Sequence, residues 1–421
     1  IKIKYRCCGL RYSAGMDKLL LISISYALAA LSAPITAFAQ SAGEPITVKP
    51  YAEIRYRLEL VDQEGVPENA TASTARIRAG LKTTEWHGLS ALIEGEAITR
   101  LGPRHYNDTV NGRTTYPVVA DPSDILLNQA WVRFKPAQQV ETIVGRQAVN
   151  FDNQRWVDSA NWRQNDQTLD AVRVAIKPVA GVSLDYGYAW RVNRALGPRS
   201  PQGIWRENDI HLLRGSANTK PIGTITAYGY FFNIPDAPLS SSKTVGLRLV
   251  GEQKMSGNAK LLYAAEYANQ RDFGTNPRTY SLDYLAFEPG VSVGVVTTKI
   301  GWEKLEGNGA VALQTPLGAL HAFNGWADKF VNTPAAGLRD LYVDVSIKLP
   351  AVAGIKGAST RLKWHDFNAS RGSINYGREW DAMLTVPIIR GLTASLIYAE
   401  YRAESFGSDT RKLWFALEAK F

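Results

Sequence analysis

Cysteine is almost absent from this 421-residue chain, since only Cys7 and Cys8 occur, side by side near the N-terminus. Disulfide frameworks and cysteine-based zinc sites need several cysteines spread through the fold, so both are excluded beyond residue 8. Methionine is also rare, with three residues, whereas 13 Phe, 19 Tyr and 11 Trp make aromatic residues common. Charged residues form 21% of the chain, close to the soluble average, which excludes intrinsic disorder.

Long hydrophobic runs are missing after the first forty residues, where none approaches the roughly 20 residues of a membrane-spanning helix. A helical membrane protein is therefore excluded. Within the first forty, the apolar segment 19–31 is followed by Ala37-Phe38-Ala39. This order is typical of a secretory signal peptide, so we predict that residues 1–39 are a signal peptide cleaved after Ala39. Met16 is a candidate start, which would place residues 1–15 upstream of it, and a buried apolar helix is the alternative for 19–31.

The formal charge of +9 is unevenly distributed. Five basic residues and one acidic residue of the leader account for four of the nine positive charges. In residues 40–421 the basic side chains are interspersed with acids rather than clustered. We therefore expect no nucleic-acid partner.

Apolar and polar residues alternate along most of the remaining chain. The last segment shows the pattern clearly, because Leu413, Phe415, Leu417, Ala419 and Phe421 alternate with Lys412, Trp414, Ala416, Glu418 and Lys420. The same alternation recurs at 53–60, 75–82, 245–249 and 397–402. In an outer-membrane barrel the apolar face of such strands meets lipid and the polar face meets a wet lumen. The pattern predicts an all-β fold, a transmembrane antiparallel β-barrel over residues 40–421.

Short and long connections alternate strictly between these segments, which is typical of tight periplasmic turns and long extracellular loops. The expected turns lie at 86–88, 135–137, 177–181, 220–223, 255–257, 288–290, 349–357 and 389–391. The expected loops lie at 61–70, 100–123, 150–165, 193–206, 234–241, 270–279, 304–338, 366–376 and 403–409. This rhythm predicts about eighteen strands, with sixteen as the alternative. We expect loops 100–123 and 304–338 to fold over or into the mouth and set the pore size.

The chain closes on the aromatic residue Phe421, which resembles the C-terminal recognition signal of outer-membrane barrels. We therefore predict recognition by the barrel-assembly machinery and location in a bacterial outer membrane, in contact with lipid and lipopolysaccharide. A secreted β-sandwich or propeller is the alternative. A propeller would need repeated blades, and the sequence shows no internal repeat.

Several blocks resemble the bacterial alginate-export family of outer-membrane channels. They are Gly145-Arg146-Gln147 with 151–156 and Trp162-Arg163-Gln164; Tyr263–Ala268; Gly301-Trp302-Glu303 with 323–328 and 338–342; and Trp364–Phe367 with 376–381. Four such blocks in order make the resemblance fairly specific, and it covers residues 45 to the C-terminus. It implies an eighteen-stranded monomeric channel with a polar, electropositive lumen that exports or takes up anionic sugars.

The polar face of the predicted strands carries many arginines, and these are the main candidates for lining the pore. The candidates are Arg55, Arg57, Arg76, Arg78, Arg133, Arg173 and Arg248, together with Arg146 in a less regular strand, Trp131, Glu379 and Asp381. Arginines in a narrow lumen would concentrate anions and could bind carboxylates or phosphates bidentately. The structural alternative is that Arg–Glu ladders only fill the lumen and fix strand register.

Six tryptophans have two interpretations. Trp156, Trp162, Trp302, Trp326, Trp364 and Trp380 could stack on sugar rings, but aromatic belts at the membrane interfaces explain most of them. Trp131 is the best exception, because Gln129 and Arg133 beside it are predicted to point inward.

An enzymatic role finds little support in the sequence. HExxH and GxxxxGK patterns are absent, and adjacent His365 and Asp366 would point to opposite faces of a strand. We expect no cofactor and no metal. The sequence therefore predicts a monomeric porin for passive diffusion or export of anionic or sugar-like solutes. An occluded structural or adhesion barrel and an outer-membrane hydrolase are the alternatives.

Overall fold

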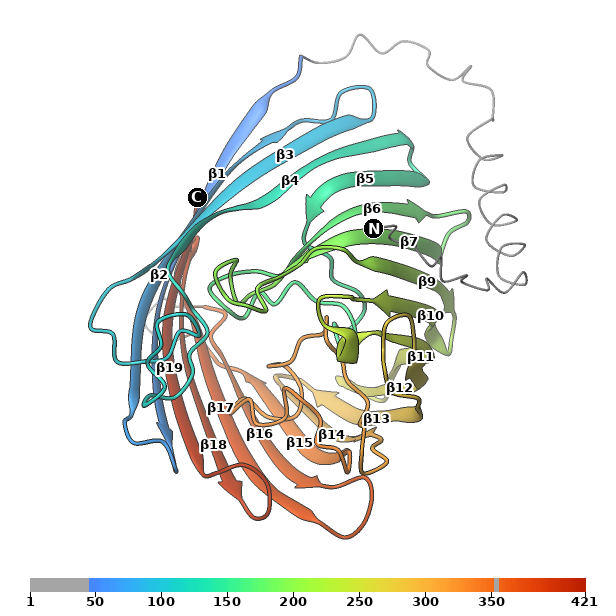
Figure 1. Cartoon of the computed structure of the whole chain (residues 1–421). Helices are drawn as coiled ribbons and strands as arrows, with labels where there is room; N and C mark the ends of the chain where they lie inside the picture. The colour runs from blue at the N-terminus through green and yellow to red at the C-terminus, as the bar shows by residue number, and fades with distance from the viewer. Residues whose placement is uncertain (1–44, 352–355) are drawn as a thin grey trace, which may run out of the picture. The chain divides into compact units, whose positions relative to one another are not determined.

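The computed structural model describes residues 45–351 and 356–421. The predicted signal peptide, residues 1–39, lies outside this part. Eighteen long strands form the wall of a closed antiparallel barrel (Figure 1). They are β1 Val48–Gln63, β2 Ala70–Thr83, β3 Leu89–Arg100, β4 Asp124–Ala137, β5 Val140–Gln147, β6 Thr168–Ile176, β7 Val182–Asn193, β9 Asp209–Thr219, β10 Gly223–Asn233, β11 Ser242–Lys254, β12 Ala259–Asp272, β13 Ser281–Val293, β14 Val296–Leu305, β15 Leu338–Lys348, β16 Ser359–Asn368, β17 Asn375–Ile389, β18 Leu392–Ala403 and β19 Thr410–Lys420.

Each wall strand pairs with the next one along the chain, and β1 pairs with β19 to close the barrel. The register of this seam runs from Glu53 opposite Lys420 to Gln63 opposite Thr410. A short strand, β8 (Ile204–Trp205), adds only to the end of β7, so β9 is the next wall strand after β7. This arrangement confirms the predicted eighteen-stranded antiparallel barrel.

Helix is scarce in the described residues, which hold one short 3-10 helix, η1 (Pro238–Ser240). None of their helices is long and apolar enough to cross a bilayer.

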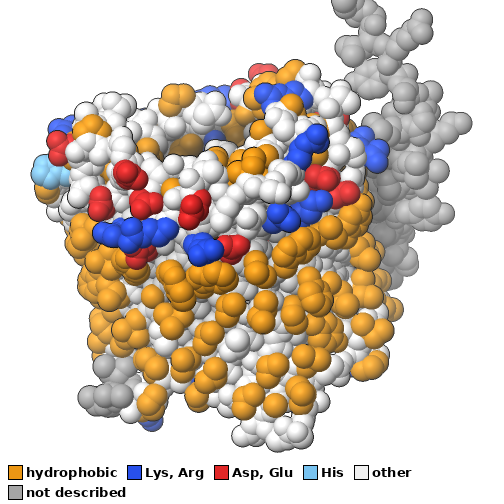
Figure 2. Space-filling model, turned by 90° about the horizontal axis from the view of Figure 1, so that it is seen from below, with side chains coloured by type: hydrophobic (Ala, Val, Ile, Leu, Met, Phe, Trp, Pro, Cys, Tyr) orange, Lys and Arg blue, Asp and Glu red, His pale blue; other side chains and the backbone are white. Residues whose placement is uncertain are grey.

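Side chains alternate between the lumen and the outer surface as the strand period requires. On β17, Glu379 and Asp381 are buried inside, whereas Trp380 between them is 59% exposed on the outside. Figure 2 shows the result, a broad apolar belt on the outer wall with charged side chains gathered along one edge. Trp302, Trp364 and Trp380 lie on this outer face, as the belt interpretation predicted.

Two of the predicted turns are wrong. Residues 288–290 lie inside β13, which turns into β14 only at Gly294, and 135–137 lie at the end of β4. Pro289 suggested a turn because proline lacks the N–H of a strand ladder. The wall tolerates it because residues 288 and 289 are unpaired toward β14, although both pair with β12. The predicted turn at 349–357 includes residues outside the described ranges.

Two long loops turn back into the barrel instead of projecting from it, and Figure 1 shows both inside the ring of strands. These are loop 148–167, between β5 and β6, and loop 306–337, between β14 and β15. Their apolar side chains form much of a buried cluster with inward residues of the wall, including Val149, Phe151, Trp156, Val157, Leu313, Leu317, Trp326 and Phe330. The lumen is therefore partly filled, and the space that remains lies between these loops and the wall.

Candidate functional site

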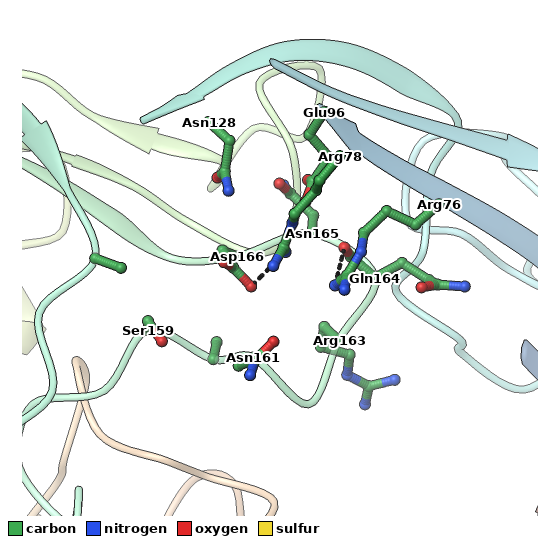
Figure 3. Close-up of polar contacts among 12 residues, drawn as sticks. Arg76, Arg78, Glu96, Asn128, Ser159, Asn161, Arg163, Gln164, Asn165 and Asp166 are labelled. Carbon is green, nitrogen blue, oxygen red and sulfur yellow. Dashed lines mark hydrogen bonds and ion pairs between the residues drawn. The ribbon is translucent and has the colours of Figure 1, made fainter. Parts of the chain in front are cut away.

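A row of arginines on β1 and β2 holds the first inward loop against the wall. Alternation places Arg55, Arg57, Arg76 and Arg78 on the inner face. Every arginine of this row contacts the loop. Arg55 Nη1 donates to the carbonyls of Asn161 (2.9 Å) and Arg163 (3.2 Å). Arg57 Nη1 donates to the carbonyl of Trp162 (2.7 Å), Arg76 Nη1 donates to that of Gln164 (3.2 Å), and Arg78 Nη2 pairs with Asp166 Oδ1 (2.6 Å). Figure 3 shows the last two. The contacts fix the path of residues 161–166 across the lumen.

Each arginine of this row also has a carboxylate partner. Arg55 pairs with Glu418 (2.6 Å), Arg57 with Glu59 (2.8 Å), Arg76 with Glu53 and Arg78 with Glu96. The pairs compensate the charge repulsion that register imposes, since Arg55 lies directly opposite Arg76. Arg76 is completely buried and Arg57 and Arg78 nearly so. These guanidinium groups therefore face the loop backbone and acids rather than open lumen.

The other predicted arginines are paired as well. Arg133 lies near Glu85 (3.3 Å) and Glu141 (3.5 Å), Arg146 binds Asp170 (2.7 Å), Arg173 lies 3.8 Å from Glu141, and Arg248 binds Glu266 (3.1 Å). They are distributed around the wall and do not form one cluster. Trp131 is half-buried on β4, two residues from Arg133. Every predicted arginine thus has an acidic partner within 4 Å, as the structural alternative requires, although Arg57 pairs with Glu59 of its own strand.

The second inward loop is fastened to the first through Asp328. Its carboxylate binds His321 Nδ1 (2.7 Å), Lys412 Nζ on β19 (2.8 Å) and Arg163 Nη2 on the first loop (3.2 Å). Burial alone would raise the pKa of Asp328, but Lys412, His321 and Arg163 hold it well below its usual range. The His321 ring also stacks on Trp162 at a centroid distance of 3.7 Å. We call this group of five side chains the latch.

Buried acids of β14 to β17 hold the other side of the second loop. Glu379 accepts a hydrogen bond from the backbone N–H of Ala327 (2.6 Å). Gly325, with φ of +86°, lies against the Glu379 carboxylate, where a Cβ would clash. Asp381 is 1% exposed and lies 3.5 Å from His365 Nε2. Glu379 therefore supports the loop from behind, and both predicted acids are closed to solvent.

His365 pairs with Asp340 on β15 (Nδ1–Oδ1, 2.8 Å), and Asp366 pairs with Arg378 on the outer face. This separation agrees with the prediction that His365 and Asp366 point to opposite faces. His365 is completely buried, so it has no access to a solute.

A cavity of about 580 Å³ lies between the inward loops and the wall. Its walls are largely apolar, with Trp162, Trp326, Leu320, Met383 and Ile397 among them. Its charged lining residues are Asp158, Arg163, Arg194, Asp328 and Arg361, beside His321.

Arg194 differs from the other cavity arginines. Its guanidinium lies over the ring of Trp205 at 4.3 Å and donates to the carbonyl of Gln202 (2.9 Å). No carboxylate lies within 4 Å of it in the described part of the chain. Burial lowers its pKa to about 10, which still leaves it charged at neutral pH. Arg194 is therefore a cation of the cavity wall without an acidic partner.

The sequence identified one of the two inward loops. It predicted that 304–338 folds over or into the mouth, and residues 306–337 lie inside the barrel, whereas 150–165 was predicted only as a polar connection. A signal was present, because Val149, Phe151, Trp156 and Val157 are unusually apolar for an exposed loop. Trp162 and Trp326, assigned mainly to the belt, lie in the lumen.

Residues 54–279 match the family described as alginate export. No curated protein matches the sequence. Solved structures similar to the barrel include OpdK of Pseudomonas aeruginosa with vanillate, at 13% identity over 89% of this chain and 98% of that one, with a TM-score of 0.69. OccAB4 of Acinetobacter baumannii is similar at 15% identity over 90% and 99%, with a TM-score of 0.69.

These structural similarities show the fold, and the family match shows the kind of protein. The predicted outer-membrane location and channel function are confirmed. A channel family also favours a transporter over an enzyme. Since the match spans more than half of the residues, the chain belongs to the alginate export family of outer-membrane channels.

Proposed function

We propose that this channel passes small anionic solutes through the cavity between its inward loops and the wall. The observation that carries the proposal is Arg194, a charged side chain on the cavity wall without a carboxylate partner. A solute carboxylate would supply the missing acceptor in a charge-assisted hydrogen bond. The cavity volume of about 580 Å³ is in the range that encloses small-molecule ligands.

The apolar wall narrows the class of anion. Aromatic and aliphatic side chains around a few charges suit a ring that carries one carboxylate, either an aromatic acid or a sugar acid. The similar barrel OpdK was solved with vanillate, an aromatic carboxylate, and this supports the first choice. The solute-binding role of Arg55, Arg57, Arg76, Arg78, Trp131, Arg133, Arg146, Arg173, Arg248, Glu379 and Asp381 stays a prediction. The contacts of Arg55, Arg57, Arg76, Arg78 and Glu379 support a role in holding the loops.

Single-channel recording in planar bilayers tests the proposal. We expect discrete conductance steps, reversal potentials that favour anions, and block by vanillate or glucuronate but not by neutral glucose. Arg194→Gln should weaken carboxylate block roughly tenfold, since a hydrogen bond to a charged group contributes about 1.5–3 kcal/mol. Arg199→Gln is the matched control, because Arg199 lies on the same loop but is exposed and contacts Asp124.

Equal block by glucose and glucuronate would contradict anion recognition. Silence from a folded, heat-modifiable barrel would instead support the occluded structural barrel, which the partly filled lumen also permits. We further propose that the barrel is a monomer and that its C-terminal strand is read by the barrel-assembly machinery.

A further inference from the structure

Three pairs of cations lie on the outer face of the barrel, near the ends of strands that lead to long loops. They are Lys243 with Arg271, Lys304 with Arg339, and Arg378 with Arg402, and each pair is directly opposed across neighbouring strands. Their inward neighbours Ser242, Gln270, Glu303, Asp340 and Glu379 are buried, so the alternation directs all six cations outward. Like charges directly opposite each other are destabilising in a sheet. Anions close to each pair would therefore stabilise the sheet.

Acids of the chain supply anions to two of the pairs. Lys304 contacts Glu306 (3.2 Å), Arg378 contacts Asp366 (3.1 Å), and Arg402 contacts Glu400 and Asp409. The third pair differs. In residues 45–351 and 356–421 neither Lys243 nor Arg271 has a carboxylate within 4 Å, and Arg271 Nε donates only to the Asn269 side chain (2.9 Å).

The position of this third pair relative to the membrane follows from the apolar residues beside it on the same face of its strands. Val245 and Leu247 follow Lys243 on the same face of β11 and are 55% and 54% exposed to lipid. Since a strand rises about 3.3 Å per residue, the cation at 243 lies roughly 7 Å beyond the last apolar residue of the belt. Figure 2 shows charged side chains gathered along this kind of edge, directly next to the apolar surface. This is the level of lipid headgroups.

We propose that Lys243 and Arg271 form a binding site for the phosphate of a phosphorylated glycolipid in the outer leaflet. The Arg271 guanidinium offers planar donors that match phosphate oxygens, and the Lys243 ammonium adds a second charge on the same anion. The acyl chains of the same lipid would lie on the apolar belt below the pair. The site is on the outer wall and is independent of solute passage through the lumen.

Native mass spectrometry of the barrel in neutral detergent, titrated with diphosphorylated lipid A, tests this site. The wild-type barrel should bind the phosphorylated lipid and bind its enzymatically dephosphorylated form at least about tenfold more weakly. The double variant Lys243→Gln/Arg271→Gln should lose roughly tenfold or more in affinity, because each basic residue contributes appreciably to anionic lipid binding.

The same two strands provide a matched control. Lys254 lies opposite Lys260 at the other end of β11 and β12. The strand alternation directs these two side chains to the face opposite that of Lys243 and Arg271. Lys254→Gln/Lys260→Gln should bind lipid A as the wild type does. Heat-modifiable migration and unchanged single-channel conductance verify the fold of both variants.

Equal binding of the phosphorylated and dephosphorylated lipids by the wild type would overturn the proposal. Full affinity in the Lys243→Gln/Arg271→Gln barrel would do the same. Should that variant misfold, the salt dependence of wild-type binding decides instead. Affinity that falls with ionic strength supports the phosphate site, and affinity independent of salt refutes it.

Discussion

At the scale of single residues, the two inward loops are held together by a buried carboxylate. Asp328 is nearly closed to solvent and is shared by Lys412, His321 and Arg163. An isolated charge in such a position would be costly, so each of these side chains depends on the others. A single carboxylate therefore joins loop 306–337 to loop 148–167 and to the wall.

The latch should weaken as the pH falls below neutrality. Burial lowers the pKa of His321 from 6.5 despite Asp328, while Arg163 and Lys412 oppose a further charge on the ring. A released loop would expose His321 and restore its ordinary pKa, so protonation favours release once the pH falls below about 6.5. The Asp328 carboxylate stays ionised there because its pKa is depressed.

We therefore expect open-channel current noise to increase between pH 7 and pH 5 in single-channel recordings. His321→Gln should remove this dependence, whereas His105→Gln, in another loop, should keep it. Equal pH dependence in all three proteins would show that the latch does not respond to His321.

At the scale of elements, the arginine row acts as an anchor for loop 148–167. Replacing Arg76 and Arg78 with Ser removes the contacts of both arginines with the loop and leaves Glu96 and Asp166 without an ion-pair partner. Glu53 would keep only Lys420, at 3.7 Å. Breaking a buried ion pair typically costs about 3–5 kcal/mol. This cost is enough to detach loop 148–167 from the inner face of the wall.

We expect the double variant Arg76→Ser/Arg78→Ser to show a larger and more variable conductance and reversal potentials shifted toward cations. Arg133 lies near the C-terminal end of β4 and pairs with Glu85 and Glu141, which are not part of loop 148–167. Arg133→Ser should therefore change the conductance and the reversal potential far less. Unchanged conductance and reversal potentials in the double variant would leave the arginine row a structural ladder only.

The sequence predicts the wall far better than its contents. Alternation is a local property, so strands such as β19 could be recognised from a few residues around Leu413 and Phe415. Pro289 suggested a turn, but the N–H that proline lacks matters only where a neighbouring strand would accept a hydrogen bond from that position. Arg76 binds Gln164, 88 residues away, and Asp328 binds Lys412, 84 residues away, and no local pattern specifies such pairings.

At the scale of the whole molecule, the two ends of the wall meet at a backbone seam. The N–H of Phe421 donates to the carbonyl of Ala52 (2.9 Å), but the Phe421 side chain is 76% exposed. The ring therefore contributes little to the finished barrel. We propose that its aromatic character acts instead in the predicted recognition step during assembly.

Phe421→Ala should leave the heat-modifiability midpoint of refolded barrel unchanged, because the seam hydrogen bonds use the backbone. In cells the same change should reduce the amount of barrel inserted in the outer membrane several-fold. Leu413→Ala, on the same strand but in the lipid-facing belt, serves as the comparison. Normal insertion of the Phe421→Ala protein would argue against recognition through this residue.

The pairing order of the wall also governs how the barrel can form. Every interface except the seam joins strands that are neighbours along the chain, so hairpins can add one after another at a small loop-closure cost. Until β19 meets β1, the growing sheet keeps two unpaired edges, and such edges promote aggregation. A chain that stops before β19 would remain an open sheet with two unpaired edge strands and would be prone to aggregate. Pairing of the final strand with β1 removes both edges and closes the barrel.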